Sequence, residues 1–203
     1  AFMGWNDGRQ FVNRDTAGGL LDKGQHFRTT LGLSTLRFIF GRTTLSGFYY
    51  HQLGKDGAGR DLNAFDVSAQ VQQTLFSNLE KGSSFKAALG FEILSGTDTG
   101  APGDESNSFA PLYGTNHAHN GYMDYFYVGG RWANNVGLQD YYLKLRNRFN
   151  SNFFTQLGGH VFLAQATPTG FVSGSLQELD PYLGTELDFS LGYIFHPAVS
   201  LQF

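Results

Sequence analysis

Residues 63–76 read NAFDVSAQVQQTLF and residues 84–95 read SFKAALGFEILS, and both stretches alternate apolar and polar side chains with a period of two. Because successive side chains of a strand point to opposite faces, each stretch predicts a strand with one apolar and one polar face. Strands of soluble domains usually end after about five or six residues, and these stretches are about twice as long. A tilted strand crosses a bilayer in about nine to eleven residues, so the two stretches predict membrane-spanning strands.

Alternation and strand-breaking residues predict further long strands along the chain. The predicted strands cover residues 26–40, 42–53, 63–76, 84–95, 136–149, 153–165 and 182–195, with shorter pieces at 1–6 and 199–203. Short and long connections alternate between them, and the long ones, rich in Gly, Asp, Asn and Thr, are residues 7–24, 54–62, 96–135 and 166–181. Outer-membrane barrels join their strands by short periplasmic turns and long extracellular loops, so the alternation predicts four extracellular loops.

Three segments need separate interpretation. Residues 121–129 would break the alternation as a spanning strand, so we interpret them as part of an outer loop that folds over or into the lumen. Residues 1–6 resemble the tail of a strand and residues 199–203 the first half of another, and we favour an internal start over a removed signal peptide. The prediction is therefore one all-β domain, residues 1–203, forming a segment of about 8–10 strands of a larger transmembrane antiparallel up-and-down β-barrel.

Composition excludes several classes of protein. Charged residues make up 15% of the chain and the formal net charge is −3, which argues against nucleic acid as a partner. No apolar run approaches the roughly eighteen residues of a membrane-crossing helix. Cysteine is absent, so disulfides, thiolate chemistry and Cys-ligated zinc are excluded.

The two faces of the predicted strands define the candidate site residues. The polar faces predict a lumen lined by Arg28, Asp66, Gln70, Gln72, Lys86, Glu92, Asp140, Lys144, Arg146, His160, Glu186 and Asp188. The apolar faces predict lipid contacts by Phe65, Val67, Val71, Leu89, Phe91, Ile93, Leu143, Leu187, Phe189 and Leu191. Aromatic residues near strand ends predict belts at the headgroup level; these are Tyr49, Tyr50, Phe76, Tyr141, Phe149, Phe153, Tyr182 and Phe195.

One predicted strand carries a row of ionisable groups on a single face. The row contains Asp140, Tyr142, Lys144, Arg146 and Arg148. In the functional interpretation it is a charged track that selects solutes by sign, as rings of charged side chains do in pores. In the structural alternative, Lys144 or Arg146 pairs with Glu186 or Asp188 on a neighbouring strand and stiffens the wall.

Metal binding and catalysis find little support in the sequence. Asn116, His117 and His119, with Asp124, invite a metal hypothesis, but no third ligand has a defined spacing. His160 lies mid-strand beside Gln156, and no serine is placed next to it for a hydrolase triad. Phosphate-loop, dinucleotide and HExxH motifs are also absent from the sequence. We therefore predict no metal, no cofactor and no enzymatic activity.

Four blocks resemble the alginate-export family of outer-membrane porins, in the versions found in Bacteroidota. The blocks are GFEILSGT at Gly90–Thr97, PLYGTNHAHNGYMDYFYV at Pro111–Val128, GLQDYYLKL at Gly137–Leu145 and LGTELDFSLG at Leu183–Gly192. They follow the order of the C-terminal half of a family member. The resemblance implies an outer-membrane barrel of about eighteen strands whose lumen passes an anionic polysaccharide.

In the founding members of the family the lumen is densely lined by arginine, and this chain departs from that pattern. Its predicted lumen mixes cations with Asp66, Glu92, Asp140, Glu186 and Asp188, so it would attract a polyanion weakly. The expected function is passive passage of hydrophilic or anionic saccharide solutes, with outer-membrane lipid as the surrounding partner. A non-conducting structural barrel that serves as a subunit of an envelope complex is the main alternative. A soluble lipocalin-like carrier, with a polar outer face, is the third.

Overall fold

The computed structural model describes residues 2–14, 20–101, 103–111, 120–126, 136–196 and 199–203. Its strands are β1 (Phe2–Arg14), β2 (Leu20–Phe40), β3 (Thr43–Lys55), β4 (Asp61–Asn78), β5 (Ser83–Leu94), β6 (Glu105–Ser106), β7 (Leu138–Arg148), β8 (Phe153–Leu163), β9 (Thr169–Val172), β10 (Ser175–Glu178), β11 (Tyr182–His196) and β12 (Val199–Gln202). In these ranges no helix has the length and apolar character needed to cross a membrane. The prediction of an all-β antiparallel fold is confirmed.

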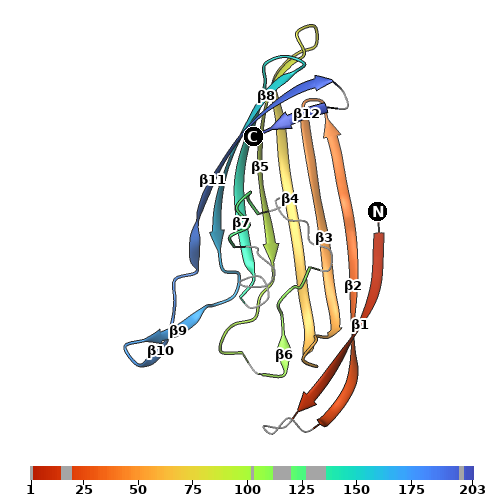
Figure 1. Ribbon diagram of the computed structural model, residues 1–203, viewed down its shortest axis with the longest axis vertical. Helices are drawn as coiled ribbons and strands as arrows, with labels where there is room; N and C mark the ends of the chain where they lie inside the picture. Colours follow the sequence, from red (N-terminus) through yellow and green to blue (C-terminus); the bar gives the residue numbers. More distant parts are fainter. Residues whose placement is uncertain (1, 15–19, 102, 112–119, 127–135, 197–198) are drawn as a thin grey trace.

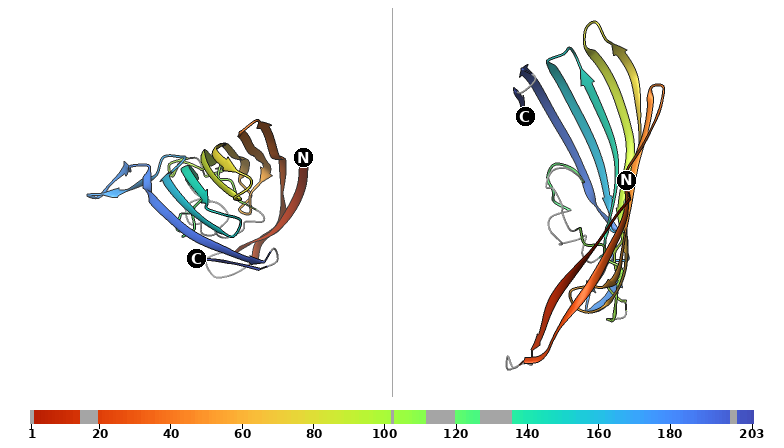
Figure 2. Two further views of the ribbon diagram at one scale, coloured as in Figure 1. Left: turned by 90° about the horizontal axis from the view of Figure 1, so that it is seen from above. Right: turned by 90° about the vertical axis from the view of Figure 1, so that its right-hand side faces the viewer.

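Nine strands form one continuous sheet in the order β1-β2-β3-β4-β5-β7-β8-β11-β12, and each neighbouring pair is antiparallel. Only the short β6 joins it in parallel, beside β4. The sheet curves into an open trough (Figures 1 and 2), and no ladder joins the edge strands β1 and β12 among the described residues. Closure into a barrel therefore stays a prediction.

The connections at one end of the sheet are tight turns, at the top of Figure 1. Gly41, with φ of 58°, turns the chain between β2 and β3, and Gly82, with φ of 63°, turns it between β4 and β5. Both positions lie in the left-handed region, which glycine adopts without steric cost. Between β7 and β8, the Asn150 side chain accepts hydrogen bonds from the backbone nitrogens of Asn152 and Phe153. Local turn chemistry therefore defines three hairpins.

Two expected loops are shorter than predicted. Residues 7–14 and 20–24 were expected within a long loop, yet they belong to β1 and β2 and pair in register from Asp7 opposite Arg28 onward. The expected loop at residues 54–62 reduces to residues 56–60, since β3 ends at Lys55 and β4 begins at Asp61. Pairing between strands satisfies backbone N–H and C=O groups whatever the side chains are. Segments rich in Gly and Asp can therefore extend the β1–β2 and β3–β4 ladders.

The other two connections stay long and contain small elements. Residues 166–181 include the β9–β10 hairpin, which projects away from the main sheet (Figure 1). In the connection between β5 and β7, residues 120–126 form no strand, in line with the loop interpretation, while residues 127–129 lie outside the described residues. The described residues 120–126 of this connection lie on the inner side of the curved sheet (Figure 2).

The core lies between the concave face of the sheet and this long connection. Phe109 and Phe126 of the connection are buried against a cluster of strand residues; its strand members are Leu62, Ala64, Leu94, Leu138 and Phe162. The rings of Phe126 and Phe162 lie 4.8 Å apart between centroids. Burial of these apolar groups therefore anchors the connection inside the trough.

Candidate functional site

The predicted lumen residues lie on the concave face, together with the long connection. Arg28, Asp66, Glu92, Asp140, His160 and Glu186 are buried, Gln70, Gln72, Lys86, Lys144 and Asp188 are partly buried, and Arg146 is exposed. They align because even-numbered residues of β4 pair with even-numbered residues of β5, and the same holds across β7, β8 and β11. The pairing register thus gathers polar groups from five strands onto one surface.

The predicted lipid-contacting residues lie on the opposite, convex face. Val71, Leu89, Leu143, Leu187, Phe189 and Leu191 are exposed, and Phe65, Val67, Phe91 and Ile93 are partly buried. Leu187 is 74% exposed and Phe189 is 62% exposed, although both lie in the middle of a 15-residue strand. A soluble monomer rarely exposes a continuous apolar surface of this kind. Whether lipid covers it stays a prediction.

Most of the predicted aromatic belt also lies on the outer surface, with one correction. The exposed members are Tyr49, Phe76, Tyr141, Phe149, Tyr182 and Phe195, and Phe153 is partly buried. Tyr50 instead packs against the apolar core of the concave face. Adjacent residues of a strand point to opposite faces, so Tyr49 and Tyr50 cannot belong to the same belt.

A buried carboxylate–imidazole pair lies at the centre of the concave face. Nδ1 of His160 lies 2.9 Å from both carboxylate oxygens of Asp140, and both side chains are 1% exposed. On its other side, His160 Nε2 lies 3.8 Å from Asp188 Oδ2. The imidazole stacks on the ring of Phe162 at 5.7 Å. Buried charge needs such partners, and an Nδ1–H donated to Asp140 fixes the tautomer of the ring.

The cations of β7 do not form the ion pairs of the structural alternative. Among the described residues, no ion pair links Lys144 or Arg146 to Glu186 or Asp188. Gly158 of β8 lies between Lys144 and Asp188 in the pairing register, which separates the two charges by a full strand. Aromatic rings approach the two cations instead.

Those aromatic contacts are close. The ammonium of Lys144 lies 4.5 Å from the ring centroid of Tyr142, and the guanidinium of Arg146 lies 4.8 Å from that of Phe154. A cation over a ring face is attracted by the ring quadrupole, so these contacts position both cationic groups on the inner surface.

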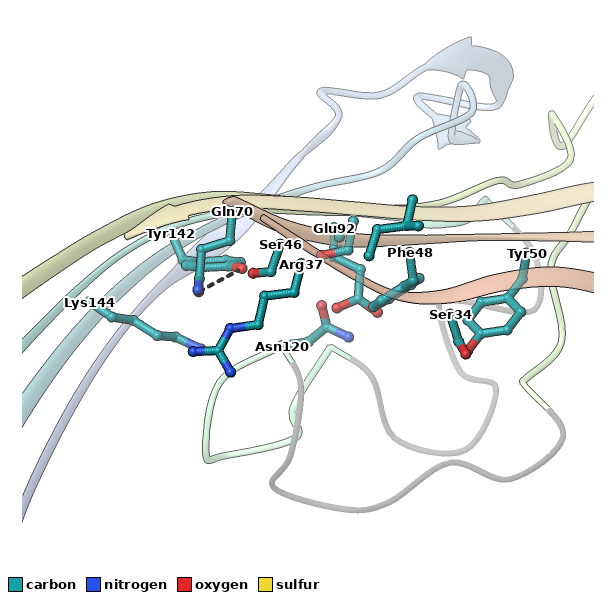
Figure 3. Close-up of a pocket in the computed structure, with 13 residues that line it drawn as sticks. Ser34, Arg37, Ser46, Phe48, Tyr50, Gln70, Glu92, Asn120, Tyr142 and Lys144 are labelled. Atoms are coloured by element: carbon teal, nitrogen blue, oxygen red, sulfur yellow. Dashed lines mark hydrogen bonds between the residues drawn. The ribbon is translucent and has the colours of Figure 1, made fainter. Parts of the chain in front are cut away.

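A cavity of about 370 Å³ opens on the concave face beside these cations (Figure 3). Arg37 of β2 and Lys144 of β7 enter it from two sides, while Asn120 of the long connection and Glu92 of β5 form part of its wall. The phenolic O–H of Tyr142 donates to Gln70 at 3.3 Å on the same surface. The lining therefore offers two cations, one carboxylate, amides and ring faces to a hydrophilic solute.

The long connection is fixed to the same face at two places. Ala110 exchanges two hydrogen bonds with the side chain of Gln52, at 2.8 and 3.0 Å, and accepts a third from Arg28 at 3.3 Å. Further along, the backbone nitrogens of Tyr122 and Met123 donate to Glu186 Oε1 at 2.6 and 2.8 Å. The described residues of the connection thus cover part of the acidic surface of the concave face.

Several components of this site escaped sequence reasoning. Arg37 lies after an irregularity in the β2–β3 register between Leu33 and Leu36, which shifts the alternation of β2. Asn120 belongs to the long connection between β5 and β7, so strand alternation could not place it in the cavity wall. The Asp140–His160 contact joins diagonal positions, because Asp140 lies opposite Phe162 and Tyr142 lies opposite His160. Correct pairing of β7 with β8 would have revealed this last contact.

The metal hypothesis falls mainly outside the described residues. Asn116, His117 and His119 are not described, and Asp124 is buried. Within the described part of the chain, no three His, Asp or Glu side chains are grouped closely enough to hold a metal ion.

Comparison with known proteins gives no further guide, since no protein-family model, no curated protein and no solved structure matches this chain.

Proposed function

We propose that this chain forms part of the wall of an outer-membrane pore that passes hydrophilic or anionic saccharide solutes by diffusion. One observation carries the proposal: long paired strands expose large apolar side chains on the convex face and collect charged and amide side chains on the concave face. A lipid-covered wall with a hydrated lumen needs that distribution, whereas a water-soluble sheet exposes its polar face.

The chemistry of the cavity supports a hydrophilic solute. Arg37 and Lys144 form no ion pair with any other described residue, so their charge is available to an anionic group. Glu92 and the buried acids Asp140 and Glu186 lie on the same face, so a dense polyanion would meet repulsion as well as attraction. The mixed lining therefore favours small saccharides or weakly anionic ones. Membership of the alginate-export family, implied by the sequence blocks, is part of this proposal.

A second candidate function has its own support. The apolar cluster around Phe126 and Phe162 fixes the long connection inside the trough, which suits an occluded structural barrel in an envelope complex. Both functions need a convex face covered by lipid, so only a measurement of ion conduction distinguishes the pore from the structural barrel.

Planar-bilayer recording of the purified protein tests the proposal. Steady single-channel currents are expected for the pore, whereas absence of current from a protein with intact β-structure would favour the scaffold. Liposome swelling in sucrose and in glucuronate then compares a neutral with an anionic probe. Recovery of the native protein from buffer without detergent would contradict both membrane functions.

A further inference from the structure

Residues 120–126 form a short strap across the concave face. At its start, the amide of Asn120 is 2% exposed, lies in the cavity wall, and forms no hydrogen bond through either Nδ2 or Oδ1 with a described residue. Two and three residues later, the backbone nitrogens of Tyr122 and Met123 donate hydrogen bonds to Glu186 of β11. The strap therefore connects a wall of the cavity directly to a carboxylate on the sheet.

Glu186 is the main polar attachment of this strap. Its Oε1 accepts from two consecutive backbone nitrogens, those of Tyr122 and Met123, and its side chain is almost fully buried. Hydrogen bonds to an ionised acceptor are stronger than neutral ones. The backbone nitrogen of Tyr122 also lies 3.3 Å from Asp188 Oδ2, which is a weaker second acceptor. Gln156 Nε2 donates to the phenolic oxygen of Tyr122 at 2.8 Å.

The backbone of the strap depends on these contacts. Asn120 and Asp124 have φ values of 57° and 53°, in the left-handed region that residues other than glycine seldom adopt. Such conformations persist where the surrounding structure imposes them. Gly121, with φ of 84°, lies so close to Glu186 that an added Cβ would meet its carboxylate at 2.5 Å. The strap is thus shaped to fit this carboxylate.

We propose that Glu186 latches residues 120–126 across the trough, that Asn120 thereby becomes a solute-contacting residue of the cavity, and that release of the latch widens the passage. A buried amide with a free donor and a free acceptor matches the hydroxyl groups of a saccharide. Glu186 is a positioning residue in this scheme. The latch is independent of conduction, whereas the widening rests on the proposed pore function.

Amide hydrogen exchange in detergent tests the latch. Gly121→Ala pushes the strap off the carboxylate without altering any strand, and Glu186→Ala removes the acceptor. In both variants we expect the amide of Met123 to exchange about tenfold faster or more than in the native protein. The amide of Tyr122 should respond less in Glu186→Ala, because Asp188 Oδ2 remains as an acceptor at 3.3 Å. Glu186→Gln keeps one acceptor oxygen, so its exchange should lie between the native and alanine values.

Matched controls separate the latch from general damage. Gly103→Ala changes a glycine of the same connection that has no atom within 4 Å of the added Cβ, and Asp66→Asn removes a carboxylate of the same face. Both controls should keep native exchange in the strap. Exchange in Gly121→Ala that stays as slow as in Gly103→Ala would overturn the latch, even if Glu186→Ala fails to fold.

Measurements of conductance and of solute block test whether release of the latch widens the passage and whether Asn120 contacts the solute. Gly121→Ala should raise single-channel conductance, and Asn120→Ala should raise the sucrose concentration that half-blocks the current by about threefold or more. Faster exchange with unchanged conductance would refute the widening and leave the latch intact. A native protein that carries no current would refute the pore function, while the exchange experiment would still decide the latch.

Discussion

Nδ1 of His160 on β8 lies 2.9 Å from both carboxylate oxygens of Asp140 on β7, and the contact is closed to solvent. The two residues are diagonal neighbours across the strand pair, since His160 lies opposite Tyr142. A buried hydrogen-bonded pair of this kind fixes the relative position of two strands, because loss of either partner leaves a polar group of the other buried without compensation.

His160→Ala should therefore destabilise the sheet. The change leaves Asp140 buried without its hydrogen-bond donor, and we expect a loss of about 3 kcal/mol in the free energy of unfolding. Urea unfolding in detergent micelles, followed by tryptophan fluorescence and by gel migration, measures it. Gln72→Ala is the control, because Gln72 lies on the same face and its side chain forms no hydrogen bond with a described residue. Equal midpoints for the two variants would exclude a structural role for the pair.

Arginine substitution on the convex face distinguishes lipid from water. Leu89 is 61% exposed in mid-strand, so Leu89→Arg should be nearly harmless in a soluble protein. In a bilayer the same change should cost about 2–4 kcal/mol near the midplane and reduce assembly. Insertion into lipid vesicles, with Gln70→Arg on the concave face as the matched control, provides the measurement. Similar assembly yields for both variants would contradict a lipid-facing convex surface.

Ion selectivity should depend on the cations of β7. Lys144 and Arg146 contact aromatic rings rather than carboxylates, so the double variant Lys144→Glu/Arg146→Glu reverses two charges of the concave face without breaking an ion pair between described residues. We expect the cation-to-anion permeability ratio to rise by about twofold or more. Reversal potentials in a salt gradient measure this ratio. Lys81→Glu, in the exposed turn between β4 and β5, should leave it unchanged.

The turn between β3 and β4 should respond to pH through Asp56. Burial tends to raise the pKa of this carboxyl, but hydrogen bonds from Arg60 and from the backbone nitrogen of Ala58 lower the pKa below its ordinary value. The guanidinium nitrogen Nη2 of Arg60 lies 2.7 Å from Asp56 Oδ2. A lowered folded pKa means that the turn is stabilised above the ordinary pKa and loses this contribution as pH falls through the folded pKa.

Amide exchange of Ala58 and Arg60 between pH 2 and pH 6 follows this loss, after correction for the intrinsic pH dependence of exchange. Protection should fall at the acid end in the native protein. In Asp56→Asn, which keeps an acceptor oxygen but cannot ionise, protection should be lower and independent of pH. A native profile that is also flat would show that the Asp56 charge does not stabilise the turn.

Local patterns located the strands well and their ends less well. Residues 63–76 and 84–95 appear as β4 and β5 with boundaries within two residues, because alternation follows directly from the pleat. Residues 7–14 carry no such alternation, yet they pair with β2 through the backbone. Composition rich in Gly, Asp and Asn indicates where turns are tolerated, whereas ladder pairing decides where a strand ends.

Away from the irregularities of β2 and β4, the sequence by itself determined which residues of a strand share a face, since the two-residue period is a local property that needs no partner. Only the tertiary structure decided which of them meet. The Asp140–His160 pair, the separation of Lys144 from Asp188, and the seating of Tyr122 on Glu186 all depend on pairing between distant segments. That pairing minimises the energy of the whole sheet and its inner connection, so no single strand encodes it.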